Sequence, residues 1–294
     1  MTNRQNISLQ AIRACADIIT RASTVTPDGF ANLRFAATAN VKPYGPFFPS
    51  SYAGEKTPAF SIAIESADLA LCAINESSSL PEAQTKIVLS LEATAKRISS
   101  CIKSIIKNHA CDFQGFDFSF APYPDDNCSI GAVFERLGCS TTGNFGSLGA
   151  AAIIASTMTQ AKYKKVGLNG LMMPVLEDSV LARRAAEGTL AVKDLLMFSA
   201  VCGTGLDTVP LPGDATREQI SALLLDVASL AVRLGKPLTA RLMPVPNRKA
   251  GDATDFDFSF FAPSRIMAFP SDTLSNHLSG SETFEIQKRH PDKD

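Results

Sequence analysis

The 294-residue chain contains no tryptophan and only three histidines, His109, His277 and His290. Two of these histidines lie close to the C-terminus, so neither a histidine-rich zinc site nor a serine, histidine and aspartate triad can be assembled. We therefore expect any proton transfer to depend on carboxylates, a cysteine thiol or bound water.

An excess of charge of one sign is also missing. The 28 lysine and arginine residues are scattered along the chain against 29 aspartates and glutamates, which gives a net charge of −1. Without a basic stripe, we expect neither nucleic acid nor an acidic membrane surface as a partner. No apolar run approaches the roughly 20 residues that a membrane helix needs, and residues 1–10 do not resemble a signal peptide.

The seven cysteines are odd in number and irregularly spaced. A small secreted protein held by disulfides would show an even and compact set of cysteines. We therefore expect a cytoplasmic protein with free thiols.

Apolar residues make up 45% of the chain and charged residues 19%, which indicates a thick core or a surface covered by another subunit. Helical and strand patterns alternate along the sequence. Helices are predicted over residues 7–22, 82–107, 130–137, 147–157, 179–188, 190–200 and 217–234, and strands over residues 33–41, 116–120, 167–175, 238–245 and 256–260. The pattern predicts one α/β domain over residues 1–270 and a polar, flexible tail over residues 271–294.

The helix predicted over residues 217–234 has the clearest beginning. Thr216 and Gln219 have the spacing of a capping box, in which each side chain bonds the backbone amide of the other residue. Polar residues form only a narrow stripe on this helix, so it must be buried on most sides, in a layered fold or at a subunit interface. We expect a homo-oligomer.

A short string occurs twice in the chain. FDFSFAP at residues 116–122 is matched by FDFSFFAP at residues 256–263. Both strings predict a strand with phenylalanines on one face and Asp117 or Asp257 on the other. Either the match is a coincidence, or the fold is built from two similar halves, as in a barrel.

Residues 201–214, VCGTGLDTVPLPGD, combine a thiol, two carboxylates, three glycines and two prolines. Such a segment suits the wall of a site, with Cys202 and Asp207 as catalytic candidates and the backbone at Gly203 and Gly205 as a binding surface for an anion. The alternatives are that Cys202 is a small buried residue at a helix end and that Asp214 supports the start of the next helix.

Glu177 and Asp178 follow an apolar strand pattern, a position where α/β folds often present functional carboxylates. They are further catalytic candidates, and the alternative is an ordinary helix start. Substrate binding is assigned to Arg241, which needs a carboxylate partner or an acidic ligand within its strand. The other candidates for substrate binding are Arg183, for which an internal ion pair is the alternative, Asn169, Gly203 and Gly205.

Asp252, Asp255 and Asp257 place three carboxylates within six residues. Together with Asp214 they are candidates to hold Ca²⁺ or Mg²⁺, because both ions prefer oxygen ligands. The alternative is a solvated loop that leads into a strand.

Several strings resemble one family. They are NLRFAATANVKPYGPFFPSSY (32–52), GLNGLMMPVLEDSVLARRAAEG (167–188), SAVCGTGLDTVPLPGD (199–214) and KPLTARLMPVPNRKAGDATDFDFSFFAPSRIM (236–267). The chain resembles the domain-of-unknown-function 711 family, also called uncharacterised protein family 0210. The resemblance implies an α/β fold like the pyruvate formate-lyase barrel, in which two parallel half-barrels of five strands each are surrounded by helices.

The chain departs from the radical enzymes that share this barrel. No glycyl radical loop follows Arg265, and Cys202 has no cysteine beside it, so we expect no glycyl radical. Gly203 and Gly205 lack the third glycine of a dinucleotide fingerprint, so we expect no NAD.

Two functions remain open. The first is a non-radical enzyme, lyase-like or transferase-like, that acts on a small polar or anionic metabolite through carboxylate, thiol or metal-assisted chemistry. The second is a non-catalytic protein that binds a metal or metabolite and assembles through apolar helices. Convergence of Cys202, Asp207, Glu177 and Arg241 in one enclosed site favours the enzyme, whereas wide separation or full pairing in salt bridges argues against it.

Overall fold

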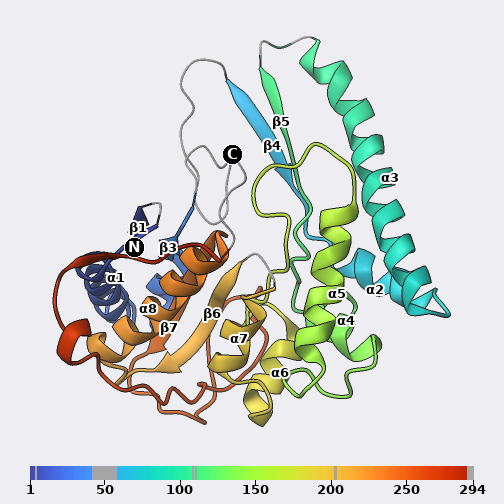
Figure 1. Ribbon diagram of the computed structural model, residues 1–294. Coiled ribbons are helices and arrows are strands. Elements are labelled where there is room, and N and C mark those ends of the chain that lie inside the picture. Colours follow the sequence, from blue (N-terminus) through green and yellow to red (C-terminus); the bar gives the residue numbers. More distant parts are fainter. Residues whose placement is uncertain (4, 42–57, 108, 110, 202–203, 290–294) are drawn as a thin grey trace.

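A computed structural model describes residues 1–3, 5–41, 58–107, 109, 111–201 and 204–289 of the chain. Within these residues the protein is a mixed α/β structure with eight α-helices and small sheets, as the sequence predicts (Figure 1). The α-helices are α1 (Leu9–Ala22), α2 (Ala67–Asn75), α3 (Leu80–Ile106), α4 (Ile130–Arg136), α5 (Ser147–Gln160), α6 (Ser179–Glu187), α7 (Val192–Phe198) and α8 (Arg217–Leu234). Short 3-10 helices are η1 (Phe30–Arg34), η2 (Asp126–Cys128) and η3 (Asn276–Leu278).

The described strands form three small sheets. The strands are β1 (Thr2–Asn3), β2 (Asn6–Ser8), β3 (Ala37–Ala39), β4 (Ala59–Ala63), β5 (Asp112–Asp117), β6 (Gly205–Pro212), β7 (Leu238–Val245) and β8 (Thr283–Glu285). β1, β2 and β8 are antiparallel, β4 is parallel to β5, and β7 lies between antiparallel β3 and parallel β6. None of these sheets closes on itself within the described residues, so the barrel stays a prediction.

Isolated bridges join two of the sheets through residues 165–174. Phe116 pairs with Lys165 and Phe120 with Leu171 on one side, and Pro174 pairs with Asp207 on the other, all in the parallel sense. The result is a row of five parallel segments, in the order β4, β5, 165–174, β6 and β7. The sequence predicts a strand over residues 167–175. The structure gives only isolated bridges there, because Asn169 has a left-handed backbone (φ 48°) and Pro174 has no amide hydrogen.

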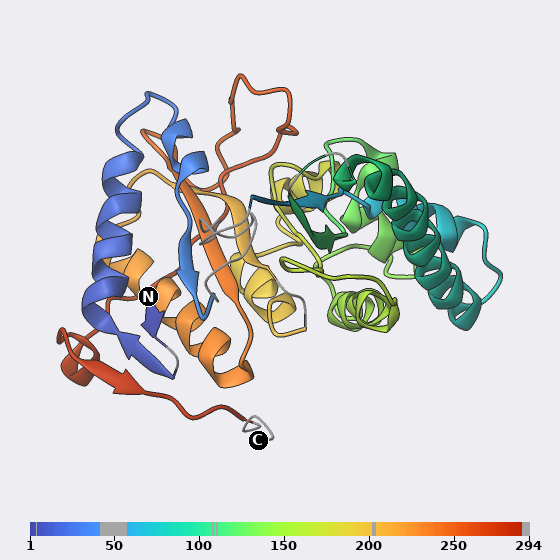
Figure 2. The same ribbon diagram turned by 90° about the horizontal axis from the view of Figure 1, so that it is seen from above.

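Two groups of helices lie near opposite ends of the row. α1 and α8 pack on each other and against β3 and β7, whereas α2, α3, α4 and α5 accompany β4 and β5 (Figures 1 and 2). α8 begins where predicted, with Thr216 and Gln219 forming the capping box, and it ends at Leu234, with Gly235 as its C-cap. Nine of its side chains are buried, which explains its nearly continuous apolar surface.

The strand predicted over residues 256–260 was wrong. This segment is an irregular loop in which Phe256, Phe258 and Phe261 pack on one another and on Phe30, with ring centroids 5.0–6.2 Å apart. The alternating phenylalanines therefore fill an aromatic cluster and not one face of a sheet. The first copy of the repeated string reaches a strand only with Phe116 and Asp117, at the end of β5, and the second copy is a loop, so the described residues do not show two similar halves.

Residues 271–294, predicted as a polar tail, include β8, which pairs with β2. No described helix is both long enough and apolar enough to span a bilayer.

Candidate functional site

A pocket of about 440 Å³ lies where β4, β5 and the 165–174 segment end. In parallel α/β sheets this edge is where ligands usually bind. The described residues that line it are Ala63, Ile64, Glu65, Asp117, Ser119, Ala121, Pro122, Met172, Pro174 and Glu177. The lining therefore combines three carboxylates with apolar side chains.

An ion pair between neighbouring strands adjoins this pocket. Arg241 on β7 donates from Nε to Oδ1 of Asp207 on β6 at 2.5 Å, and Asp207 is fully buried. Burial opposes the charge of Arg241, but Asp207 and Glu177 outweigh this effect and raise its pKa. Oδ2 of Asp207 is buried and receives no hydrogen bond within the described part of the chain.

A β-bulge holds Asp207 in this position. The pairing of β6 with β7 shifts register between Leu206 and Val209, and Thr208 within the shift has a φ of 40°. A positive φ is costly for a β-branched residue. Bulges of this kind redirect side chains beside functional sites, and here the bulge contains Asp207.

Glu177 connects the ion pair with the pocket. Its Oε1 lies 3.5 Å from Nη2 of Arg241, and its side chain is 26% exposed. Burial and the charge of Asp207 raise the pKa of Glu177 to about 7, although Arg241 acts in the opposite direction. Glu177 is therefore a carboxyl group that can exchange a proton near neutral pH.

Glu65 is a site residue that the sequence interpretation missed. It lies between the end of β4 and the start of α2, and it lines the pocket with Glu177. Burial raises the pKa of Glu65, and its charge in turn raises that of Glu177. Its one sequence signal was its position directly after a short apolar strand pattern.

Asp117, also in the lining, is held by the protein itself. Its carboxylate accepts hydrogen bonds from the backbone amides of Ser119, Leu168 and Asn169 and from the Ser119 hydroxyl. A Cβ atom added at Gly167 would lie 2.3 Å from Oδ2 of Asp117, so glycine permits this close approach. Asp117 thus anchors the loop that forms one wall.

Asp178 lies next to Glu177 but serves two helices. Its buried carboxylate accepts bonds from Val180 and Leu181 at the start of α6. It also accepts from the Ser129 hydroxyl and the amides of Ile130 and Gly131 at the start of α4. Asp178 therefore supports a helix start, as in the alternative given from the sequence, and it does so for two helices. A catalytic role of Asp178 stays a prediction.

Two predicted binding residues shape the backbone. A Cβ atom at Gly205 (φ 98°) would lie 2.2 Å from the carbonyl oxygen of Thr239, so β6 can approach β7 only with glycine there. The Asn169 side chain bonds the Phe116 carbonyl, the Phe118 amide and the Tyr163 hydroxyl. Cys202 and Gly203 lie outside the described residues.

The structure does not bring the remaining predicted residues to the site. Arg183 is half-exposed and lies 3.6 Å from Asp126, as in the ion-pair alternative. Asp252 accepts from the Lys249 amide, and Asp255 pairs with Arg248. Asp214 and Asp257 are exposed. No group of three or more histidine, cysteine or acidic residues that could hold a metal occurs among the described residues.

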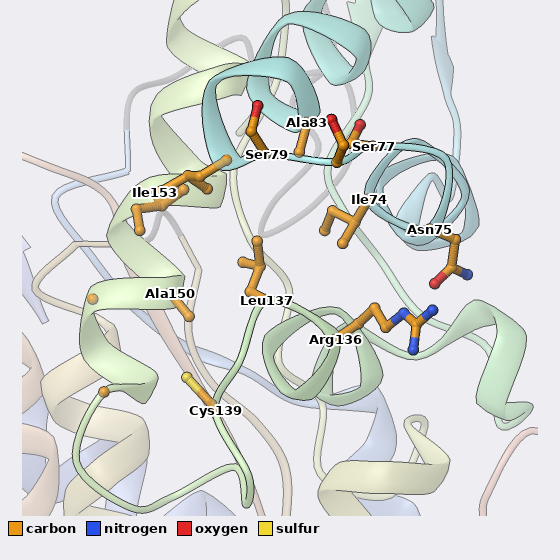
Figure 3. Close-up of a pocket in the computed structure, with 14 residues that line it drawn as sticks. Ile74, Asn75, Ser77, Ser79, Ala83, Arg136, Leu137, Cys139, Ala150 and Ile153 are labelled. Carbon is orange, nitrogen blue, oxygen red and sulfur yellow. The ribbon is translucent and has the colours of Figure 1, made fainter.

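Figure 3 shows another pocket, of about 510 Å³, between α2, α3, α4 and α5. Its described lining includes Ile74, Ala83, Arg136, Cys139 and Ala150. Arg136 is the one charged side chain in that lining, so the pocket offers no paired acid and base. The smaller pocket beside Glu177 is therefore the better candidate for chemistry.

Comparison with known proteins agrees with the resemblance of the sequence. A family model described as "Uncharacterised ACR (DUF711)" matches residues 1–264. The chain belongs to the DUF711 family. Its members include a UPF0210 protein of Pyrobaculum aerophilum, which is 35% identical over 263 residues that cover 85% of this chain and 56% of the relative. A UPF0210 protein of Clostridium perfringens is 26% identical over 87% of this chain and 58% of the relative.

This DUF711 chain thus spans a little over half the length of the curated relatives it matches. Glu65, Asp117, Glu177, Asp207 and Arg241 all lie within the family match.

Proposed function

We propose that this DUF711 protein is a non-radical enzyme that transfers a proton to or from a small polar metabolite, with Glu177 as the acid or base. The observation that carries the proposal is the position of Glu177, between the pocket and the buried pair of Asp207 and Arg241. A lyase-like reaction, in which a carboxylate removes a proton from a carbon or oxygen atom, fits this arrangement.

The roles of the other residues follow from their contacts. Arg241 stabilises the ionised form of Glu177, and Asp207 fixes the guanidinium through Nε. Neither carboxylate is fully paired, because Glu177 is partly exposed in the pocket and Oδ2 of Asp207 has no donor among the described residues. This incomplete pairing supports the enzyme over a purely structural salt bridge. Cys202 remains a candidate for thiol chemistry.

We also propose that the five-segment parallel row is one half of the pyruvate formate-lyase-like barrel. Its five members and their uniform direction support this assignment. An experimental structure of one of the longer relatives would test it. A second row of five parallel strands facing the first is expected, and a relative with a single open row would refute the barrel.

The test of the catalytic role is a search for turnover. Wild-type protein is incubated with mixtures of small polar metabolites, and proton NMR follows the loss of each compound or its exchange of hydrogen for deuterium. Glu177→Gln is expected to lower the rate by about 10²-fold or more, because it removes the acid–base group. The control is Glu285→Gln, on the surface strand β8, which should leave the rate unchanged.

If Glu177→Gln retains full turnover, the acid–base role is wrong. If a metabolite binds wild-type protein without being changed, the non-catalytic binding protein becomes the better description.

A further inference from the structure

We propose that the pocket beside Glu177 takes a small organic cation, an alkylammonium compound, and not an anion. This inference rests on the same site as the proposed function and names its ligand class. It reverses the sequence expectation that Arg241 holds an anionic substrate.

The described lining of the pocket is acidic. The described lining residues include Glu65, Asp117 and Glu177 and contain no lysine or arginine. Asp117 accepts its bonds from amides and a hydroxyl, so none of these partners is a cation that would cancel its charge. A pocket with acidic walls and a low-dielectric surround attracts cations and repels anions.

Arg241 does not reverse the acidic charge of the lining. It is absent from the described lining, and its Nε donates to the buried carboxylate of Asp207. Its charge is therefore matched before any ligand arrives. A ligand carboxylate would have to compete with Asp207 at Nε and with Glu177 at Nη2, and displacement of Asp207 would leave a buried charge without its partner.

A buried carboxylate oxygen beside Arg241 lacks a donor among the described residues. Oδ2 of Asp207 is fully buried and has no hydrogen-bond partner within the described residues. Buried carboxylate oxygens normally receive hydrogen bonds. Asp207 is not in the described lining, but its charge reaches the pocket, because it raises the pKa of Glu177. An ammonium group carries three donors and no acceptor, so it suits the carboxylates of Glu65 and Glu177 in front of this buried acceptor.

The apolar part of the lining suits the rest of such a ligand. Ala63, Ile64, Met172 and Pro174 offer no strong hydrogen-bonding side chain. An alkyl chain can pack against them while its ammonium group faces Glu65 and Glu177. The pocket volume of about 440 Å³ is that of a small-molecule site.

The experiment compares matched probes on the whole protein. Butylammonium and 1,4-diammoniobutane are titrated against butanol, butyrate, succinate and Mg²⁺, and binding is measured by calorimetry. We expect both ammonium compounds to bind, and 1,4-diammoniobutane to bind more tightly. Glu65→Gln/Glu177→Gln should weaken ammonium binding about tenfold or more, whereas Glu285→Gln should not.

A second measurement does not depend on variants. The carboxyl carbon of Glu177 is followed by NMR in wild-type protein labelled with ¹³C-glutamate. Saturation with 1,4-diammoniobutane should lower the pKa of Glu177 from its value of about 7, because a nearby positive charge favours the ionised form.

Butyrate or succinate binding more tightly than the ammonium compounds would overturn the proposal, as would preference for Mg²⁺. The proposal would also be overturned if neither ammonium compound binds. The same holds if they bind but Glu65→Gln/Glu177→Gln leaves their affinity unchanged and the pKa of Glu177 does not move. Failure of the proposed function looks different. Ammonium binding without turnover of any cation would remove the catalytic role alone, whereas Glu177-dependent turnover of an anion would remove the ligand class alone.

Discussion

Arg241 lies between two carboxylates that differ in burial. Asp207 is fully enclosed and makes the shorter contact, at 2.5 Å, whereas Glu177 is 26% exposed and lies 3.5 Å away. The enclosed carboxylate sets the position of the guanidinium, and the exposed one can meet a ligand. This asymmetry makes Glu177 the member of the group whose proton can be exchanged.

The raised pKa of Glu177 predicts a pH-dependent stability. Its pKa is about 7 in the folded protein, above the ordinary value of 4.5. The stability that this group contributes is therefore complete below about pH 4.5 and is lost as the pH rises through about 7. Wild-type protein should lose on the order of 2 kcal/mol from this source between about pH 5 and about pH 8.

Urea unfolding at both pH values measures the effect. Glu177→Gln should remove most of this pH dependence and be more stable than wild type at the higher pH, while Glu285→Gln should behave like wild type. An unchanged slope in Glu177→Gln would mean that Glu177 titrates in its ordinary range.

A double-mutant cycle tests the pair of Asp207 and Arg241. Arg241→Met leaves the Asp207 carboxylate buried without its partner, and Asp207→Leu removes the shorter carboxylate contact of the Arg241 guanidinium and leaves that with Glu177. Each change should cost about 3–5 kcal/mol of unfolding free energy, whereas the double variant should cost less than the sum of the two. Additive costs in urea unfolding would show that the two charges are not coupled.

At the level of elements, one side chain joins two helices. Asp178 caps α6 from the preceding residue and α4 from 48 residues away in the sequence. Both helix starts are therefore fixed to the turn that presents Glu177. The position of the candidate acid–base group depends on this shared cap.

Asp178→Ala removes the acceptor for five hydrogen bonds. We expect a loss of about 3 kcal/mol or more, because several amide and hydroxyl groups become buried without partners. The matched control is Asp126→Ala, since Asp126 is an exposed aspartate that bonds Ser179 and should cost less than about 1 kcal/mol. Equal costs in urea unfolding would argue against the shared cap.

Elements with strong local signals were predictable from the sequence. Thr216 and Gln219 mark the start of α8, and Gly188 marks the end of α6. Residues 256–260 were not predictable, because alternating phenylalanines suit a strand and an aromatic cluster equally well. The choice depends on Phe30, a partner far away in the sequence.

At the scale of the whole molecule, the site combines distant parts of the chain. Glu177, Asp207 and Arg241 were each candidates from the sequence, but their mutual contacts arise only when β6, β7 and the turn after residue 174 come together. Glu65 was missed because it belongs to no motif. Only the folded structure places it in one pocket with Asp117 and Glu177. The sign of the charge in the pocket likewise depends on the fold, because Arg241 makes its shorter contact with Asp207 and not with a carboxylate of the lining.

The sparse bridging of residues 165–174 also predicts where the backbone opens locally. Few backbone bonds join this segment to β5 and β6, so its amide hydrogens should exchange with deuterium sooner than those within β6 and β7. Met172 and Pro174 of this segment line the same pocket as Ala63 at the end of β4 and Glu65 just after it. A compound bound in this pocket would contact both the 165–174 segment and β4, and it would slow the exchange of the amide hydrogens of that segment. Binding is therefore measurable by hydrogen exchange before any reaction is known.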